Sequence, residues 1–324
     1  MIKLFNSVLI IILWTNVYGQ KIQILSQGYH TDSSFYSVQK INENEYWVAG
    51  ENGILKKIDS LGNMSRLNLP VEKIDILKII MTNNYVFLTT ANSIIYRYDI
   101  DRGVFIKKTF PEFKNKCFYD IIESEDGKLI VCGGARGIAR GDKVIPKGFI
   151  ATVDKDLTEI EVVWKCYRKF VWSLLECENK NILGVTFNGL NTRLIKSDNL
   201  MKWKNDRKIK GLVYNTALID KRIWYCGAKS IHVNQYGTMG ITTEKQKVSN
   251  NTGCLWSMER VHETIIAATQ SGELIKIDKE SGEFEKIKTP DFFTLYDMEK
   301  MSDSRMLVVG HGKTVYIIDF KGYF

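Results

Sequence analysis

Residues 35–59 read FYSVQKINENEYWVAGENGILKKID, and residues 294–319 read TLYDMEKMSDSRMLVVGHGKTVYIID. Each segment has an aromatic residue in a first apolar run, a polar turn, a second apolar run, and a third run that ends in Asp. Such self-similarity within one chain is the signature of a repeat architecture, in which one structural unit is built several times. Further copies are therefore expected between the two segments.

The position of the aromatic residue in the first run, here called the register mark, recurs through the chain. It holds an aromatic residue in every copy except the second, which has Leu77. After Tyr36 the intervals are 41, 42, 53, 42, 42 and 40 residues, which gives the marks Leu77, Tyr119, Trp172, Tyr214, Trp256 and Tyr296. The runs are short, rich in Ile, Val, Tyr and Trp, and bounded by turn residues, as is typical of β-strands. Four such strands repeated about every 40 residues predict the blades of a β-propeller.

We therefore predict an all-β fold, a seven-bladed β-propeller with four-stranded antiparallel blades, in a single domain over residues 20–324. Blades are expected to start near residues 35, 76, 118, 171, 213, 255 and 295. The seventh copy ends after its third strand, whereas the strand-like run KIQILSQ (21–27) precedes the first copy. The N-terminal strand is thus expected to complete the last blade and close the ring, which removes exposed sheet edges. Six or eight blades, or an open β-solenoid, are the alternatives.

Two segments resemble known repeats. EYWVAGENGILKKIDSLGN (45–63) and SGELIKIDKESGEFEK (271–286) are similar to repeats of exported β-propellers of the WD-like, quinoprotein-like and photosystem-assembly-factor-like superfamily. The resemblance covers essentially residues 20–324. The Trp-Asp and Gly-His signatures of true WD repeats are missing, so the resemblance implies a fold and not a chemistry.

Residues 1–19 have the features of a cleavable signal peptide. Lys3 supplies a positive start, LFNSVLIIILW (4–14) an apolar core, and Gly19 a small residue before a cut at Gln20. A membrane anchor is the alternative, but the run is shorter than the roughly 20 apolar residues that a span needs. We expect the mature protein to be secreted or periplasmic, with no transmembrane span.

Composition narrows the classes of partner. With 44% hydrophobic and 25% charged residues, the 324-residue chain is not expected to be disordered. Its net charge of +8 favours an anionic glycan or other anionic ligand, or a protein, as partner, and nucleic acid is not expected without a binding motif. The chain is expected to be a monomer. The six cysteines form no C-x-x-C pair and are expected to be mostly free, buried thiols; one disulfide pair is the alternative.

The 53-residue interval comes from an insertion in the third copy, ARGIARGDKVIPKG (135–148). It falls between strands two and three, whose loops share the top face of a propeller with the loops that lead into strand one. One interpretation is a tolerated, solvated loop; the other is an anion-binding flap, because Arg forms paired hydrogen bonds with carboxylate, sulfate or phosphate. The residues predicted to bind are Arg136, Arg140, Lys143 and Lys147.

The register marks are the second predicted binding set. Structurally, six aromatic side chains at equivalent positions can pack between blades. Functionally, they can form a ring near the central channel that stacks sugars or grips a peptide. The residues are Tyr36, Tyr119, Trp172, Tyr214, Trp256 and Tyr296.

Motifs for catalysis or metal binding are weak. His30, Asp32 and His311 fall near one junction of blades, but three ligands from loops are a poor pattern, so neither a metal nor a cofactor is predicted. No nucleophile or zinc-hydrolase motif occurs. Asp120 and Asp297 hold equivalent positions in blades far apart around the ring. The sequence favours a non-enzymatic recognition or assembly scaffold that binds on its top face; the alternative is a hydrolase or lyase acting on a glycan or small ester at the channel mouth.

Overall fold

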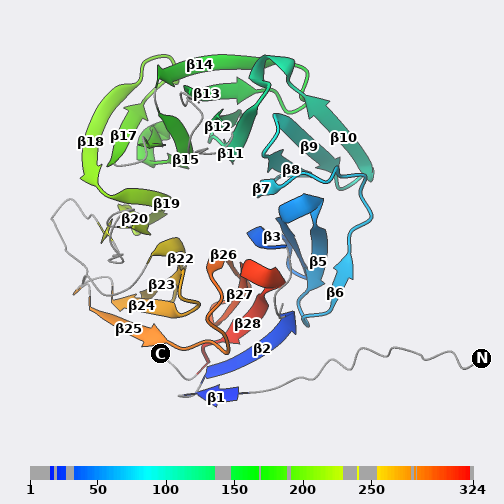
Figure 1. The fold of residues 1–324 in the computed structure, drawn as a ribbon, viewed down its shortest axis with the longest axis vertical. Coiled ribbons are helices and arrows are strands. Elements are labelled where there is room, and N and C mark those ends of the chain that lie inside the picture. The colour runs from blue at the N-terminus through cyan, green and yellow to red at the C-terminus, as the bar shows by residue number, and fades with distance from the viewer. Residues whose placement is uncertain are drawn as a thin grey trace, which may run out of the picture.

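A computed structural model describes residues 15–17, 20–26, 33–135, 147–167, 169–187, 191–228, 239–240, 254–278, 281 and 283–321. Its strands form antiparallel sheets that are arranged in a ring around a central axis (Figure 1). In six of the sheets, strands that follow one another in the chain are neighbours, and the first strand lies innermost. This is the blade arrangement of a β-propeller.

Three of the sheets come from the first half of the chain. One contains β3 (Phe35–Asn42), β4 (Glu45–Gly50), β5 (Leu55–Asp59) and β6 (Met64–Arg66). The next contains β7 (Ile76–Thr82), β8 (Tyr85–Thr90), β9 (Ile94–Asp99) and β10 (Val104–Thr109). The third contains β11 (Lys116–Glu123), β12 (Leu129–Ala135), β13 (Lys147–Val153) and β14 (Ile160–Tyr167).

Three further sheets follow. The fourth contains β15 (Phe170–Glu176), β16 (Ile182–Phe187), β17 (Asn191–Ser197) and β18 (Lys204–Lys210). The fifth contains β19 (Leu212–Ile219), β20 (Arg222–Ala228) and β21 (Met239–Gly240). The sixth contains β22 (Leu255–Val261), β23 (Thr264–Thr269), β24 (Leu274–Asp278) and β25 (Phe284–Ile287).

The last sheet takes strands from both ends of the described chain (Figure 1). It contains β26 (Leu295–Lys300), β27 (Arg305–Gly310), β28 (Val315–Asp319), β2 (Gln20–Ser26) and β1 (Thr15–Val17). β2 pairs antiparallel with β28, with Lys21 opposite Asp319 and Ile24 opposite Tyr316. The N-terminal strand therefore occupies the fourth position of this sheet.

The blade count differs from the prediction in one sheet. Six sheets have at least four strands, whereas the β19–β20–β21 sheet has three among the described residues, and β21 is two residues long. The prediction of seven four-stranded blades is therefore corrected to six such blades in the described part of the chain. The predicted remainder of this blade falls on residues 229–238 and 241–253, which lie outside the described residues.

Short 3-10 helices occupy several loops: η1 (Glu51–Gly53), η2 (Pro111–Phe113), η3 (Glu178–Lys180) and η4 (His311–Lys313). Among the described residues, the structure has no helix of the length and apolarity that a membrane crossing requires. The six cysteines carry thiols and not disulfides; Cys166 is half-buried and the other five are buried.

The hydrophobic core is divided among the spaces between blades. One cluster joins Val38 and Val48 of the first blade to Leu307 and Val309 of the last. The second strand of each blade is buried almost throughout, as in β4 and β27, because blades cover it on both faces. A fully buried strand is expected to read as a continuous apolar run, which explains segments such as YWVAG. Many small cores thus replace one large core.

A glycine at the end of strand two allows a close approach to the start of strand one. A Cβ atom on Gly50 would lie 1.8 Å from the carbonyl oxygen of Ser34, and one on Gly310 would lie 2.2 Å from that of Thr294. Only glycine fits such an approach. This contact positions the chain directly before the register mark.

Candidate functional site

A β-bulge lies at the register mark of every first strand. In β3 the pairing passes from Phe35 to Ser37, and in β22 from Leu255 to Ser257, so Tyr36 and Trp256 have no partner across the ladder. The other five first strands shift register at the same place. A bulge adds one residue and re-aims its side chain. The bulges therefore explain why a residue of strand one leaves the sheet pattern and faces the axis.

The marks of all seven sheets line one central cavity of about 790 Å³. Its wall is mixed: the aromatic rings are accompanied by hydroxyl, carboxylate and amide groups. Cavities of roughly 300–1,000 Å³ with a mainly apolar lining and a few polar groups are typical of small-molecule and side-chain binding sites. The cavity is therefore the candidate site.

The six aromatic marks form a continuous row of ring contacts, here called the aromatic belt. Successive centroids lie 4.9 Å apart for Tyr119–Trp172, 5.9 Å for Trp172–Tyr214, 4.3 Å for Tyr214–Trp256, 5.4 Å for Trp256–Tyr296 and 5.4 Å for Tyr296–Tyr36. Leu77 stands between Tyr36 and Tyr119 and leaves the belt open at one blade. The rings thus touch across blade boundaries and also line the cavity, so the two sequence-based interpretations are compatible.

In three blades the residue after the mark accepts a hydrogen bond from the next blade. The Val38 N–H donates to Asp297 Oδ2 at 3.1 Å, the Leu174 N–H to Asp120 Oδ2 at 2.8 Å, and the Ile79 N–H to Ser37 Oγ at 3.2 Å. In all three cases the donor lies two residues after the next blade's mark. Asp120 and Asp297 hold equivalent positions in the sequence repeats, and each of them therefore connects its blade to the next one.

Lys78 takes the same position in the blade that lacks an aromatic mark. Its Nζ lies 3.7 Å from Asp297 Oδ2, and this carboxylate raises the pKa of the Lys78 ammonium, with a smaller contribution from Asp120. Burial raises the pKa of Asp120 to about 6, although Lys78 and the Leu174 N–H lower it. Lys78 therefore remains a cation and a donor, whereas Asp120 titrates near neutrality.

Several polar atoms of the cavity wall have no hydrogen-bond partner. In the described residues they are Thr82 Oγ1, Ser173 Oγ, Thr216 Oγ1 and Trp256 Nε1. Ser173 is 8% and Thr216 7% exposed. Ser173 is equivalent to Ser37, whose hydroxyl accepts from the next blade. Serine at this position can therefore find a partner, and the lack of one is specific to the blade of Ser173. A buried polar group without a partner costs about 1–3 kcal/mol, which a ligand group is able to recover.

Two carboxylates, Glu51 and Asp75, lie in loops beside the cavity. The Tyr36 hydroxyl donates to Glu51 Oε1 at 2.6 Å, and burial, followed by this hydrogen bond, raises the pKa of Tyr36. Asp75 lines the cavity and accepts from the Asn52 N–H at 3.0 Å. These carboxylates belong to loops that the sequence did not single out.

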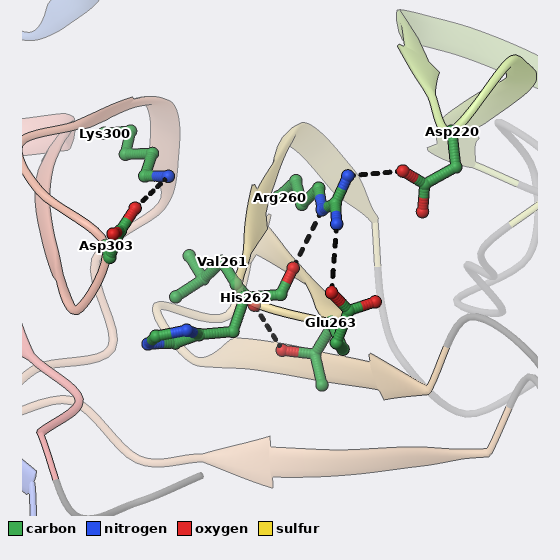
Figure 2. A network of polar contacts seen from close by, with 8 residues as sticks. Asp220, Arg260, Val261, His262, Glu263, Lys300 and Asp303 are labelled. Atoms are coloured by element: carbon green, nitrogen blue, oxygen red, sulfur yellow. Dashed lines mark hydrogen bonds and ion pairs between the residues drawn. The ribbon is translucent and has the colours of Figure 1, made fainter.

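Glu259 and Glu299 lie three residues after their marks, at positions equivalent to Gln39 and Ile80 of the cavity wall. Burial raises the pKa of both; for Glu299 it reaches about 8, with Asp297 and Glu259 as further causes. The basic residues that follow them are engaged elsewhere. Figure 2 shows Arg260 turned toward Asp220 and Glu263, and Lys300 turned toward Asp303. The distance from Lys300 Nζ to Asp303 Oδ1 is 2.8 Å.

Most of the basic insertion lies outside the described residues. Arg136, Arg140 and Lys143 lie outside the described residues. Lys147 is exposed at the start of β13 and is not part of the cavity wall. The predicted anion-binding flap therefore stays a prediction.

The structure gives no support to a histidine metal site within the described residues, where no three His, Cys, Asp or Glu are placed to hold an ion. His30 and Asp32 lie outside them. His311 Nδ1 lies 3.1 Å from Ser34 Oγ and shares a hydrogen bond with it.

Comparison with known proteins supports the fold. No protein-family model and no curated protein matches the sequence. A catalytically inactive virginiamycin B lyase from Staphylococcus aureus, solved with quinupristin, is 11% identical with a TM-score of 0.72, over 93% of this chain and 99% of that one. YCF48 bound to D1 peptide is 10% identical with a TM-score of 0.67, over 95% and 98%. The WD40 β-propeller domain of Doa1 is 11% identical with a TM-score of 0.64, over 92% and 95%. At these identities the likeness establishes the fold alone: the chain is a β-propeller.

Proposed function

We propose that this protein is an exported, non-enzymatic β-propeller that recognises a ligand in its central cavity, entered from the top face. The observation that carries the proposal is the aromatic belt around a cavity of about 790 Å³ with unpartnered polar atoms in its wall. Rigid aromatic rings supply contact area at low entropic cost, and the polar atoms supply orientation. Among the structural neighbours, the lyase was solved with quinupristin and YCF48 with a peptide.

The proposal also includes a seventh blade, the closure of the ring by β2, export and a monomeric state. We infer that the β19–β20–β21 sheet is the seventh blade and that β2 closes the ring as the fourth strand beside β28. A signal peptide cut near Gly19 would leave β2 at the mature N-terminus. The protein is proposed to act as a monomer, with the insertion at 135–148 as a second contact for an anionic partner.

The test uses a variant that is expected to fold normally and to narrow the cavity. Leu77→Trp places an aromatic residue at the one mark that lacks it, so the belt position should accept the side chain while the cavity shrinks. Val104→Trp is the matched control, because Val104 is 45% exposed on the outer strand β10. A fragment library with cationic, neutral and anionic members is screened against the full chain by saturation-transfer NMR.

We expect fragments that bind wild type and Val104→Trp but lose their signal with Leu77→Trp, while circular dichroism shows both variants folded. If every hit binds all three proteins equally, the cavity is not the binding site and the proposal fails. A screen without any hit to wild type contradicts it as well.

One observation favours the enzymatic alternative. Asp120 lines the cavity and its pKa is raised to about 6, which suits a general acid or base near neutral pH. The same fragments are therefore incubated with the protein and analysed by mass spectrometry. Fragments recovered intact support recognition; conversion that is lost in Asp120→Asn would establish the hydrolase or lyase instead.

A further inference from the structure

We propose that the central cavity selects an organic cation, an ammonium group with a hydrogen-bond acceptor close to it. This inference rests on the proposed recognition function and adds the chemical class of the ligand. It differs from the expectation from composition, because a chain with a net charge of +8 would be expected to favour anions.

The aromatic belt provides the first argument. Six electron-rich rings from adjacent blades line one cavity. The faces of Tyr and Trp rings attract cations, and several rings around one site are the arrangement that binds quaternary ammonium groups. A neutral ligand of the same shape gains the contact area but not this attraction.

Charge provides the second argument. The cavity wall contains the acids Asp75, Asp120, Glu123 and Asp297, against one basic residue, Lys78, among the described residues. Lys155 pairs with Glu123, and Lys78 lies beside Asp297 and also interacts with Asp120, so the carboxylates of the wall still outnumber its ammonium group and Asp75 has no cationic partner among the described wall residues. Glu51 beside the cavity adds to this acidic field. Field lines concentrate in a cavity of low dielectric, so its local sign outweighs that of the distant surface.

The unpartnered atoms define the rest of the ligand. The hydroxyl oxygens of Ser173 and Thr216 are able to accept from an O–H or N–H of the ligand or to donate to an acceptor. The Trp256 Nε1–H only donates. A bare cation would leave this donor unsatisfied. A cation with a neighbouring hydroxyl or carbonyl oxygen satisfies both kinds of group.

The experiment uses three probes of one shape. Choline is the cation. Its uncharged isostere is 3,3-dimethylbutan-1-ol, in which a tert-butyl group replaces trimethylammonium. The anion is 3,3-dimethylbutanoate. Each is titrated into the full chain at constant ionic strength, with tryptophan fluorescence and calorimetry as readouts. We expect choline to bind about tenfold or more tightly than the uncharged isostere, because only the cation gains the attraction of the rings.

Variants locate the charge effect. Asp75→Asn keeps an acceptor for the Asn52 N–H and should weaken choline roughly threefold without affecting the uncharged isostere. Lys78→Met removes the repelling ammonium and should tighten choline. Glu161→Gln, on the exposed face of the outer strand β14, removes the same charge far from the cavity and should change nothing.

Each outcome decides. Equal binding of choline and its uncharged isostere overturns the cation inference but leaves the cavity as the ligand site. Failure of all three probes to bind also overturns it, and the fragment screen with Leu77→Trp then decides separately whether the recognition function stands. A choline affinity that falls equally in Asp75→Asn and Glu161→Gln would mean that only the net charge of the protein matters.

Discussion

Glu299 is the residue whose protonation should be visible in the stability of the protein. Burial raises its pKa to about 8, helped by Asp297 and Glu259 and opposed by Lys78 and the backbone N–H of Lys40. Between its ordinary value of about 4.3 and about 8, the folded protein keeps a proton that the unfolded chain has released. Because the folded state then binds more protons, its stability falls as pH rises through this window.

The prediction is that Glu299→Gln flattens this dependence. At about pH 5 the variant and wild type should melt at similar temperatures, and at about pH 8 the variant should melt higher, because its amide never ionises. Thermal melts across this range measure the effect. Glu43→Gln is the control, since Glu43 is 85% exposed and should run parallel to wild type. A constant difference between Glu299→Gln and wild type at all pH values would argue against a raised pKa.

At the scale of one element, the bulge of strand one has a consequence for deletions. Leu255 and Ser257 already pair with the consecutive residues Thr269 and Ala268. Removing Trp256 should therefore leave a regular ladder, at a cost of about 3 kcal/mol for the lost contacts. Removing Met258, which lies inside the ladder, shifts the register and turns every following side chain to the other face.

Urea denaturation of the two single-residue deletions measures this difference. We expect the Trp256 deletion to unfold cooperatively and the Met258 deletion to lose the cooperative transition or to shift it much further. Similar midpoints for both would show that the bulge is not what accommodates the mark.

The same bulge explains what the sequence was able to predict and what it was not. The period of the marks follows from apolar runs separated by turns, so the strands of blades such as β3–β6 could be expected from residues 35–66 alone. The direction of the marks could not, because a bulge breaks the alternation on which such an assignment depends. Tyr36 was equally compatible with packing between blades and with lining the channel.

The rest of the site depends on contacts between blades. Asp120 and Asp297 lie far apart around the ring, yet Lys78 interacts with both. Lys78 could not be predicted from the pattern because it follows Leu77, the one mark without an aromatic ring. Acidic residues beside the cavity, such as Asp75, lie in loops whose approach to the axis is set by the ring and not by any local pattern.

For the whole molecule, the pairing of β2 with β28 predicts a dependence on the N-terminal strand. A variant that starts at residue 27 exposes the edge of β28, whose Val315, Tyr316 and Ile318 are fully buried. We expect its melting temperature to fall on the order of 10 °C, since losing one strand's pairing costs several kcal/mol in a protein of this size.

The control is a variant that starts at residue 20 and keeps β2. It should melt close to the full chain. If the two truncated proteins melt at the same temperature, β2 does not complete the last blade, and the proposed closure of the ring is wrong.

If β2 closes the ring as proposed, the antiparallel pairing of Lys21 with Asp319 also makes the order of blades along the gene largely arbitrary. A hairpin loop that joined these two positions would turn the backbone into a circle, which could then be opened between any two blades. The blades would keep their neighbours, and the belt its order of rings. In engineering terms the molecule is a natural substrate for circular permutation, and a fused domain could be attached opposite any chosen blade.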